Sequence, residues 1–348
     1  MAALSDRRRI NAPSGGTTAP VFAKTLKEPG YLEELRPQRS RDPKELRKIC
    51  ECLQCFITVT AHPQKLKLVL TTLSTVLQTS IIPSASGSAY LEIPNTNPPS
   101  TSTLIPPTSS LKITASVQGP KPLPRSAPFS PTLLLTTTVK FAPFATRHRR
   151  GYIRDVAERD LGVHLETALR GVIIGERWPK SGVEVVVTVL EGDEDAWWGQ
   201  DGGGNGSGWG LLNVLAGCIT VAGAAIADAG IDCVDMVSGG VAAFVRGPAD
   251  GGEVLALDPC PAEHQEIVAA CAVGYLHSRD EVTEVWLKGD AGLEAADSLI
   301  EGATQAAQGS FGVMKEVLLE NMGKNVKPED ATSKVGGKRK QVEVEMTG

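Results

Sequence analysis

The sequence predicts an α/β (α+β) domain in which helices pack on a mixed sheet. Residues 183–192 form a nearly unbroken run of β-branched and apolar side chains, which is typical of a buried strand. Residues 210–229 are rich in Ala and Leu and carry no charge before Asp228, which indicates a buried helix. Strand-like and helix-like segments alternate along the chain, and 41% of its 348 residues are apolar, which is enough for a sizeable core.

The start of the chain lacks the signals of a folded core. Residues 1–45 are polar and interrupted by prolines, so we expect an extended N-terminal arm. Residues 46–80 have an unusual composition with three cysteines, and we interpret them as an atypical insertion. Two origins are open for it, a lineage-specific insertion or a retained intron in the gene model, and sequencing the transcript distinguishes them.

The domain itself is expected over residues 81–325. Its first half is predicted to contain three strands, at residues 111–117, 133–144 and 183–192. Pro- and Ser-rich loops at 94–109 and 118–131 flank the first of these strands. Before the strand 183–192, leucines spaced four residues apart share one face of a predicted helix over 154–174.

The second half is predicted to begin with the buried helix and to continue as an antiparallel meander. The expected strands are 233–245, 253–258, 267–276 and 281–289. A final helix from about 293 to 322 closes the fold. The charged residues 326–348 are expected to form a disordered tail.

No cofactor or metal site is predicted. The chain has seven cysteines, and four of them lie in or beside apolar stretches, as buried thiols of an intracellular protein do. Cys50, Cys52 and Cys55 with His62 match no standard spacing of zinc ligands. The N-terminus has no apolar core of a signal peptide, and the apolar run 214–227 is too short to span a bilayer, so we expect a soluble chain without membrane contacts.

The segment DGGGNGSGWG, residues 201–210, contains six glycines and raises the question of a phosphate site. A dinucleotide-binding loop needs glycines at i, i+2 and i+5 directly after a strand, and no frame here provides them. A P-loop needs Lys and then Ser or Thr after its last glycine, where this chain has Leu211 and Leu212. The pattern therefore favours a solvated connection over a nucleotide site.

Six segments of the chain follow one another in a distinctive order. They are GSAYLEI (87–93), KFAPFATRHRRG (140–151), RDLGVHLETALRGVIIGERWPKSGVEVVVTVLEGDE (159–194), AAIADAGI (224–231), DMVSGGVAAFV (235–245) and LDPCPAEHQEIVAACAVGYL (257–276). In this order they resemble the RNase PH family of phosphorolytic 3′-to-5′ exoribonucleases and their ring-forming relatives, over residues 87–322. The resemblance implies that residues 87–93 form the first core strand of the domain. With DRRRINAP near the N-terminus, they are similar to the ring subunits of the eukaryotic RNA exosome.

A first departure from the family concerns phosphate. Active members bind it with a Thr-Arg pair early in the central helix, and the resemblance places these positions near Val214 and Leu215. No arginine lies anywhere between Glu191 and Val245. An apolar side chain offers no charge-assisted hydrogen bond to phosphate, so the family's phosphate-binding position is predicted to be lost at Leu215.

A second departure concerns the acids that active members carry after a Leu-Asp step. Asp258 and Glu263 remain, but the next positions of the pattern hold His264 and Ala270. Ala270 can neither hold a metal nor move a proton, and His264 is interpreted as an exposed loop residue rather than a general acid. We therefore predict that the chain is not an enzyme.

Arginines of the loop after the strand 133–144 are candidates for RNA contacts. The net charge of −5 excludes a generally basic surface, so such contacts must come from a local cluster. In the family this loop faces the central channel of the ring, and here it carries Arg147, Arg149 and Arg150. Their guanidinium groups would bind phosphate without reading sequence, and an ordinary solvated loop or one that contacts a neighbouring subunit's acids is the alternative.

The resemblance implies a non-catalytic subunit of a hetero-hexameric ring of RNase PH-like subunits, capped by RNA-binding subunits. The implied role is 3′-to-5′ processing and degradation of RNA in nucleus, nucleolus and cytoplasm, and Arg7, Arg8 and Arg9 of the arm are expected to contact a partner. Two alternatives are open: an active phosphorolytic 3′-to-5′ exoribonuclease, and a free-standing RNA-binding protein.

Overall fold

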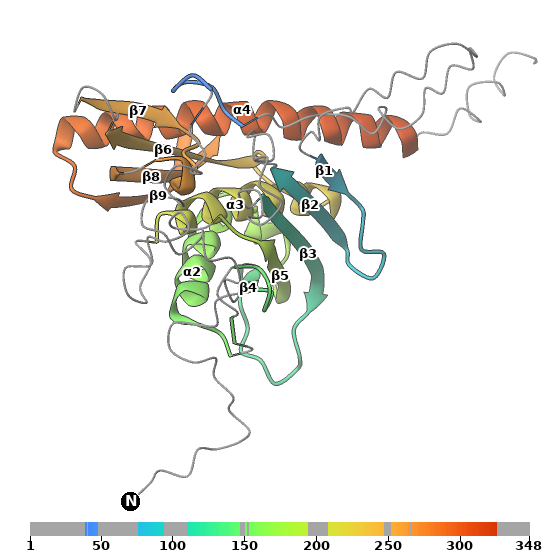
Figure 1. Cartoon of the computed structure of the whole chain (residues 1–348). Helices are drawn as coiled ribbons and strands as arrows, with labels where there is room; N and C mark the ends of the chain where they lie inside the picture. The colour runs from blue at the N-terminus through green and yellow to red at the C-terminus, as the bar shows by residue number, and fades with distance from the viewer. Residues whose placement is uncertain are drawn as a thin grey trace, which may run out of the picture.

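The computed structural model describes residues 39, 41–47, 76–93, 110–146, 150–151, 153–193, 208–246, 252–264 and 266–325. In this part the chain forms two β-sheets with three long helices, and the sheets and helices alternate in layers (Figure 1). The strands are β1 (Val76–Thr79), β2 (Gly87–Ile93), β3 (Leu111–Pro122), β4 (Leu134–Phe141), β5 (Ser181–Glu191), β6 (Val237–Arg246), β7 (Glu253–Leu257), β8 (Ile267–Leu276) and β9 (Glu281–Gly289). The helices are α2 (Val156–Arg170), α3 (Gly210–Asp228) and α4 (Leu293–Asn325).

The first sheet has five strands in the order β1-β2-β3-β5-β4. Strands β4 and β5 are parallel and its other neighbouring strands are antiparallel, so the predicted mixed sheet is confirmed. Parallel neighbours need a crossover connection, and α2 supplies it between β4 and β5. A capping box of Asp155 and Glu158 starts this helix, and Leu161, Leu165 and Leu169 form its fully buried face.

The second sheet has four antiparallel strands in the order β7-β6-β8-β9. The predicted meander is therefore wrong, because β8 pairs with the free edge of β6 instead of following β7. Strand β6 lies in the centre of this sheet, and its residues are buried on both faces of the sheet, from Val237 to Ala243 without interruption. A strand of this kind is typical of a position covered on both sides.

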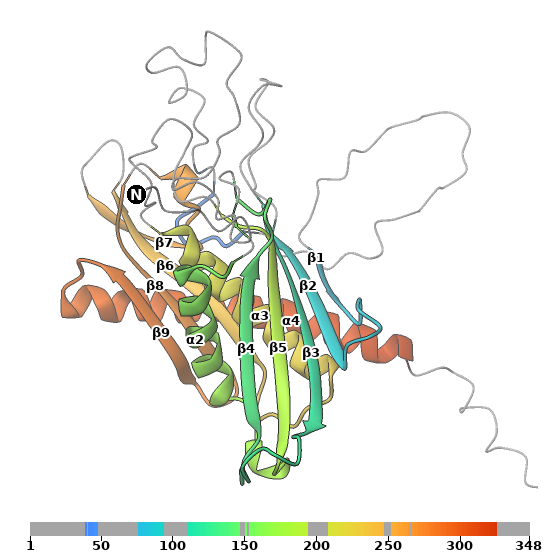
Figure 2. The same ribbon diagram turned by 90° about the horizontal axis from the view of Figure 1, so that it is seen from below.

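Helices α2 and α3 lie between the two sheets, and α4 covers the opposite face of the second sheet (Figure 2). Helix α3 packs on β2 and β3 on one side and on β6 and β8 on the other. By length and composition α3 could cross a membrane, but 89% of its apolar window is buried inside the protein. It is the core helix that the sequence predicted, and its apolar surface is used within the fold.

Some boundaries differ from those expected from the sequence. Strand β1 lies inside residues 46–80, the segment interpreted as an insertion, and it pairs with β2. Strand β3 extends to Pro122, into the predicted loop 118–131. Outside the described residues lie most of the arm with Arg7, Arg8 and Arg9, the loop 94–109, residues 201–207 of the glycine segment, Cys50, Cys52, Cys55, His62 and the tail 326–348.

Candidate functional site

Helix α3 has apolar side chains at the positions where the resemblance places the Thr-Arg pair that binds phosphate in active members. Val214 and Leu215 are 1% and 0% exposed, and both belong to the main hydrophobic core. An arginine at either position would have to bury its guanidinium group among apolar side chains, which is costly without a partner. These positions therefore hold the two sheets together and offer no donor to an anion.

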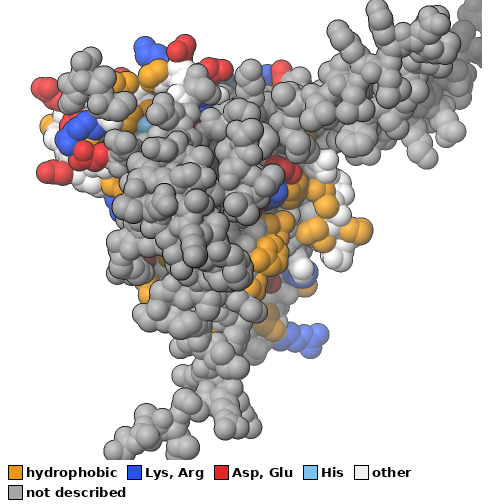
Figure 3. Space-filling view, viewed as in Figure 1, with side chains coloured by type: hydrophobic (Ala, Val, Ile, Leu, Met, Phe, Trp, Pro, Cys, Tyr) orange, Lys and Arg blue, Asp and Glu red, His pale blue; other side chains and the backbone are white. Residues whose placement is uncertain are grey.

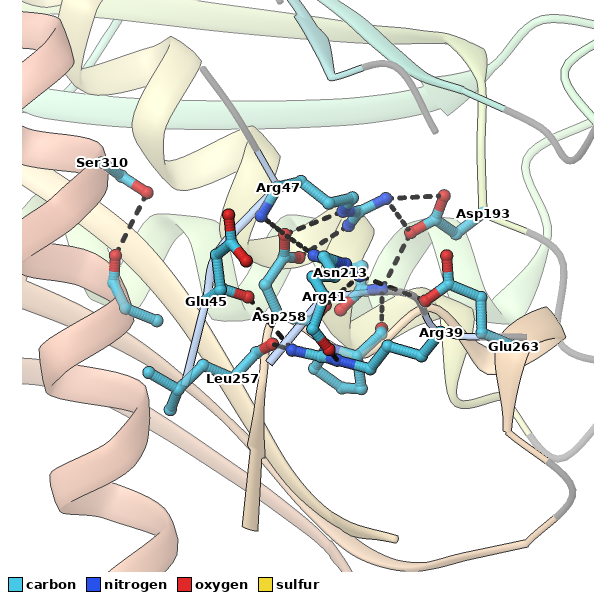
Figure 4. A network of polar contacts seen from close by, with 12 residues as sticks. Arg39, Arg41, Glu45, Arg47, Asp193, Asn213, Leu257, Asp258, Glu263 and Ser310 are labelled. Atoms are coloured by element: carbon cyan, nitrogen blue, oxygen red, sulfur yellow. Dashed lines mark hydrogen bonds and ion pairs between the residues drawn. The ribbon is translucent and has the colours of Figure 1, made fainter. Parts of the chain in front are cut away.

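Asp258 follows the end of β7 and is held by an arginine from the N-terminal part of the chain (Figure 4). The guanidinium fork of Arg47 donates from Nη2 to Oδ1 of Asp258 at 2.7 Å and from Nε to Oδ2 at 2.8 Å. The backbone N–H of Arg47 also donates to Oδ2, at 3.1 Å. Two parallel bonds from one guanidinium to one carboxylate form the strongest kind of ion pair in proteins.

The same guanidinium reaches the end of β5. Nη1 of Arg47 lies 3.1 Å from Oδ2 of Asp193, and both side chains are almost completely buried. Asn213, in the first turn of α3, donates from Nδ2 to Asp193 at 2.8 Å and to the carbonyl of Pro259 at 2.6 Å. Arg47 thus connects a carboxylate at the end of one sheet to a carboxylate at the end of the other.

Two further arginines extend this network. Nη2 of Arg41 lies 3.2 Å from Oε2 of Glu263, which sits in a 3₁₀ turn over Pro261–Glu263, and donates to the carbonyl of Asp258 at 3.2 Å. Nη2 of Arg39 donates to backbone carbonyls of residues 42, 43 and 45 and to that of Leu257, at 3.0 to 3.1 Å. These contacts fold residues 41–47 onto the end of β7. We call Arg39, Arg41, Arg47, Asp193, Asp258 and Glu263 the arginine–acid cluster.

Electrostatics within the arginine–acid cluster shift the pKa values of Asp258, Arg47 and Arg39. Burial alone would raise the pKa of Asp258, but the charge and hydrogen bonds of Arg47, with the charge of Arg41, hold that pKa well below its usual range. Burial acts to lower the pKa of Arg47, and the charges of Asp193 and Asp258 outweigh it and hold the pKa above its ordinary value. Burial and the charge of Arg41 lower the pKa of Arg39 to about 10. The cluster has three cations and three anions, so its carboxylates are neutralised by the same chain.

The lowered pKa of Asp258 predicts a loss of stability in acid. An Asp in the unfolded chain titrates near pH 4, so folding favours the ionised form and the stabilisation is complete above that pH. As the pH falls below about 4 towards the lowered pKa, this contribution to the free energy of unfolding is lost progressively. Denaturant unfolding at a series of pH values measures the slope. In Asp258→Asn the slope in this range should be shallower, and an unchanged slope would contradict the assignment.

His264 and Ala270 occupy different surroundings from those expected. His264 is half-buried after the 3₁₀ turn, so its interpretation as an exposed loop histidine is wrong, and its backbone N–H donates to the carbonyl of Pro261 at 3.4 Å. His264 directly follows Pro261, Ala262 and Glu263, and because these three residues are buried, the end of the turn lies close to the protein interior. Ala270 is 2% exposed in the middle of β8, opposite Ala243, and is part of the core.

Of the loop arginines, the described residues include Arg150 alone, and Arg147 and Arg149 lie outside them. The guanidinium carbon of Arg150 lies 4.1 Å from the centre of the Phe141 ring, and Nη1 lies 3.8 Å from a carboxylate oxygen of Asp155. One face of this guanidinium is therefore occupied within the chain. The side chain of Arg150 as a whole is 25% exposed, so it can still meet a ligand from solvent.

Sequence reasoning missed Arg39, Arg41, Arg47, Asp193 and Asn213. A signal was present, because Asp193 lies two residues after the apolar strand β5 and Asp258 directly follows β7, and carboxylates that enter a core need cations. The segment SRDPKELR supplies arginines of the cluster, but it was assigned to the arm and the insertion.

On the face shown in Figure 3, acidic and basic side chains lie intermingled at the end that carries β6 and β7, and hydrophobic side chains gather near β2 and β3. In the part of the chain that the structure describes, no group of three or more His, Cys, Asp or Glu is placed to hold a metal ion.

Comparison with known proteins identifies the family. Residues 74–232 match the profile described as "3′ exoribonuclease family, domain 1", RNase_PH. The exosome complex component MTR3 of Chaetomium thermophilum is 44% identical over 327 residues, which cover 92% of this chain and all of the relative. The chain belongs to the RNase PH family. The similarity to ring subunits of the eukaryotic RNA exosome that the sequence predicts is confirmed by this identity, and the relative is the fungal subunit named for mRNA transport.

More distant members agree over the same length. The MTR3 component of Schizosaccharomyces pombe is 26% identical and covers 93% of this chain and all of the relative. The human MTR3 component is 24% identical, with 90% of this chain and 94% of the relative covered. Among solved structures, rice Rrp46 superposes with a TM-score of 0.56 at 18% identity, over 80% of this chain and 98% of that one. This likeness confirms the predicted RNase PH fold.

Proposed function

We propose that the chain is a non-catalytic structural subunit of the exosome core ring. In this role it supports 3′-to-5′ processing and degradation of RNA, including rRNA processing and mRNA decay, by completing the ring and by helping to line its RNA channel. The family, the near-complete coverage of relatives named exosome components, and the fold support this assignment. As partners it takes other RNase PH-like ring subunits, the RNA-binding cap subunits and RNA, and it acts in nucleus, nucleolus and cytoplasm.

The observation that carries the non-catalytic role is the state of the remaining acids. Asp258 and Glu263 are the carboxylates left in the family's acidic pattern, and both are paired with arginines of the same chain. A carboxylate whose pKa is depressed by a bidentate arginine is a poor general acid or base at neutral pH. The adjacent helix offers buried Val214 and Leu215 in place of a cation for phosphate.

The test is a phosphorolysis assay of the full chain, alone and in a reconstituted ring, with labelled RNA and inorganic phosphate. We expect no release of nucleoside diphosphates from either preparation, with an active phosphorolytic member of the family as the positive control. Release that disappears in Asp258→Asn would establish the alternative of an active exoribonuclease.

Co-purification distinguishes a ring subunit from a free-standing RNA-binding protein. We expect the chain to elute from cell extract with other RNase PH-like subunits, and elution alone near 37 kDa, its monomer mass being 36.7 kDa, would favour the free-standing protein. We further propose that Arg7, Arg8 and Arg9 contact a partner subunit, so their joint replacement by Ala should reduce the recovered partners. RNA contact by Arg147, Arg149 and Arg150 is likewise part of the proposal.

A further inference from the structure

Phe144 is a large apolar side chain that the fold leaves in solvent. It lies three residues after the end of β4 and is 74% exposed. The nearby Phe141, in contrast, is 1% exposed and is covered by the guanidinium of Arg150 at 4.1 Å. A phenylalanine ring in water lacks the stabilisation that its burial would give, so an exposed ring at a fixed place is a candidate binding site for a ligand that covers it.

The backbone around Phe144 is held by hydrogen bonds. The N–H of Ala145 donates to the carbonyl of Ala142 at 2.9 Å, which forms a turn with Phe144 in it. The N–H of Gly192, at the end of β5, donates to the carbonyl of Ala145 at 2.9 Å, and the N–H of Arg150 donates to that of Pro143 at 3.2 Å. The ring is therefore presented on an anchored turn, which lowers the entropy lost when a ligand orders it.

The sequence around this turn is basic throughout. Residues 140–154 contain one lysine and four arginines and no Asp or Glu, a local charge of +5 in a chain whose net charge is −5. An exposed aromatic ring within a run of cations is the combination that binds single-stranded nucleic acid, in which phosphates pair with cations and bases stack on rings.

We propose that Phe144 is a stacking platform for bases of single-stranded RNA. The inference rests on the proposed function and deepens it, because it adds a base contact beside the phosphate contacts of the loop arginines. Stacking accepts any base, since every base has a π-face, and a subunit that guides RNA of any sequence needs a contact of this kind. The net positive charge of residues 140–154 favours RNA over an apolar protein surface, because phosphates complement that charge and an apolar surface does not.

The experiment uses rings reconstituted with the full chain and carrying Phe144→Ala, Phe144→Leu or Phe144→Trp. Phe129 provides a matched control, because it is 73% exposed and precedes β4, whereas Phe144 follows it. The eight residues of β4, a strand about 26 Å long, lie between the two residues in the chain. Binding of a single-stranded RNA oligonucleotide is measured by affinity and by photocrosslinking of 4-thiouridine to this chain.

We expect Phe144→Ala and Phe144→Leu to weaken RNA binding or crosslinking by about 5- to 160-fold and Phe144→Trp to retain it. Phe129→Ala should match the unmodified ring. The salt dependence should stay unchanged in Phe144→Ala, whereas Arg147→Ala with Arg149→Ala should lower the slope of log K against log salt by about 0.7 for each phosphate that the variant no longer neutralises.

Two results would overturn the stacking role. One is RNA binding by Phe144→Ala equal to that of Phe129→Ala, and the other is failure of the Phe144→Ala ring to assemble, which would place Phe144 in a contact between subunits. If the arginine variant weakens binding and Phe144→Ala does not, stacking fails and the channel role stands. If neither variant changes binding or crosslinking, the channel role itself fails.

Discussion

Replacement of Arg47 by Ala is expected to lower the free energy of unfolding by about 3–5 kcal/mol. The variant removes one guanidinium that serves two carboxylates, Asp193 and Asp258. The side chain of Asp193 is 0% exposed, so its charge would stay in the interior with the neutral amide of Asn213 as its hydrogen-bond donor. A typical domain is stable by about 5–15 kcal/mol in total, so the loss would be a large fraction of the whole.

The geometry of Arg47 makes a second variant informative. Arg47→Lys keeps the positive charge but loses the planar fork, which now donates to both oxygens of Asp258 while it also faces Asp193. We expect it to be less stable than the original chain and more stable than Arg47→Ala. This order would show that both the charge and the fork contribute.

Denaturant unfolding of the full chain provides the measurement. Arg170→Ala is the matched control, because Arg170 also pairs with a carboxylate, that of Glu166, but its side chain is 73% exposed. Exposed pairs of this kind contribute about 0.3–0.5 kcal/mol, so the control should change little. Equal stability of Arg47→Ala and Arg170→Ala would show that the arginine–acid cluster does not hold the two sheets together.

The sequence predicted the elements of the fold well and their order in space less well. The strands 267–276 and 281–289 have the bounds expected, because apolar runs between turn residues are a local signal. The strand 87–93, which the family resemblance implied, has the expected bounds as well. The pairing of β8 with β6 was not predicted, since which edge a strand joins depends on contacts between residues far apart in sequence. Strand β1 was missed because four residues within an unusual segment carry too short a pattern.

The sequence predicted which positions of the candidate site lack the chemistry of active family members, but it did not predict which polar residues the site contains. Leu215 and Ala270 were singled out as positions without chemistry, and both lie in the core. The arginine–acid cluster could not be derived from spacing, because Arg47 and Asp258 are 211 residues apart in sequence. Only the folded chain brings them together, and their ion pair decides the state of the remaining acids.

Strand β6 contains two adjacent glycines, of which Gly239 faces α3 and Gly240 faces α4 on the other side of the sheet. A Cβ on Gly239 would lie 2.2 Å from the carbonyl oxygen of Ala216 in α3. A Cβ on Gly240 would lie 2.1 Å from the carbonyl oxygen of Ala303 and 2.3 Å from the nitrogen of Ala307, both in α4. Successive side chains of a strand point to opposite faces, so this pair lets two helices approach the same strand backbone from both sides.

Gly240→Ala is therefore expected to destabilise the chain by about 3 kcal/mol or more, at the upper end of the cost of overpacking. The atoms that the new methyl group would meet belong to the backbone of α4, so no side chain can rotate away, and the helix itself must shift off the sheet. Gly312→Ala, in the same helix, is the control, because nothing lies within 4 Å of its Cβ position, and it should stabilise the helix by up to about 1 kcal/mol. Thermal and denaturant unfolding of the two variants should thus move in opposite directions. A Gly240→Ala chain as stable as the original would mean that α4 does not approach β6 as closely as this packing requires.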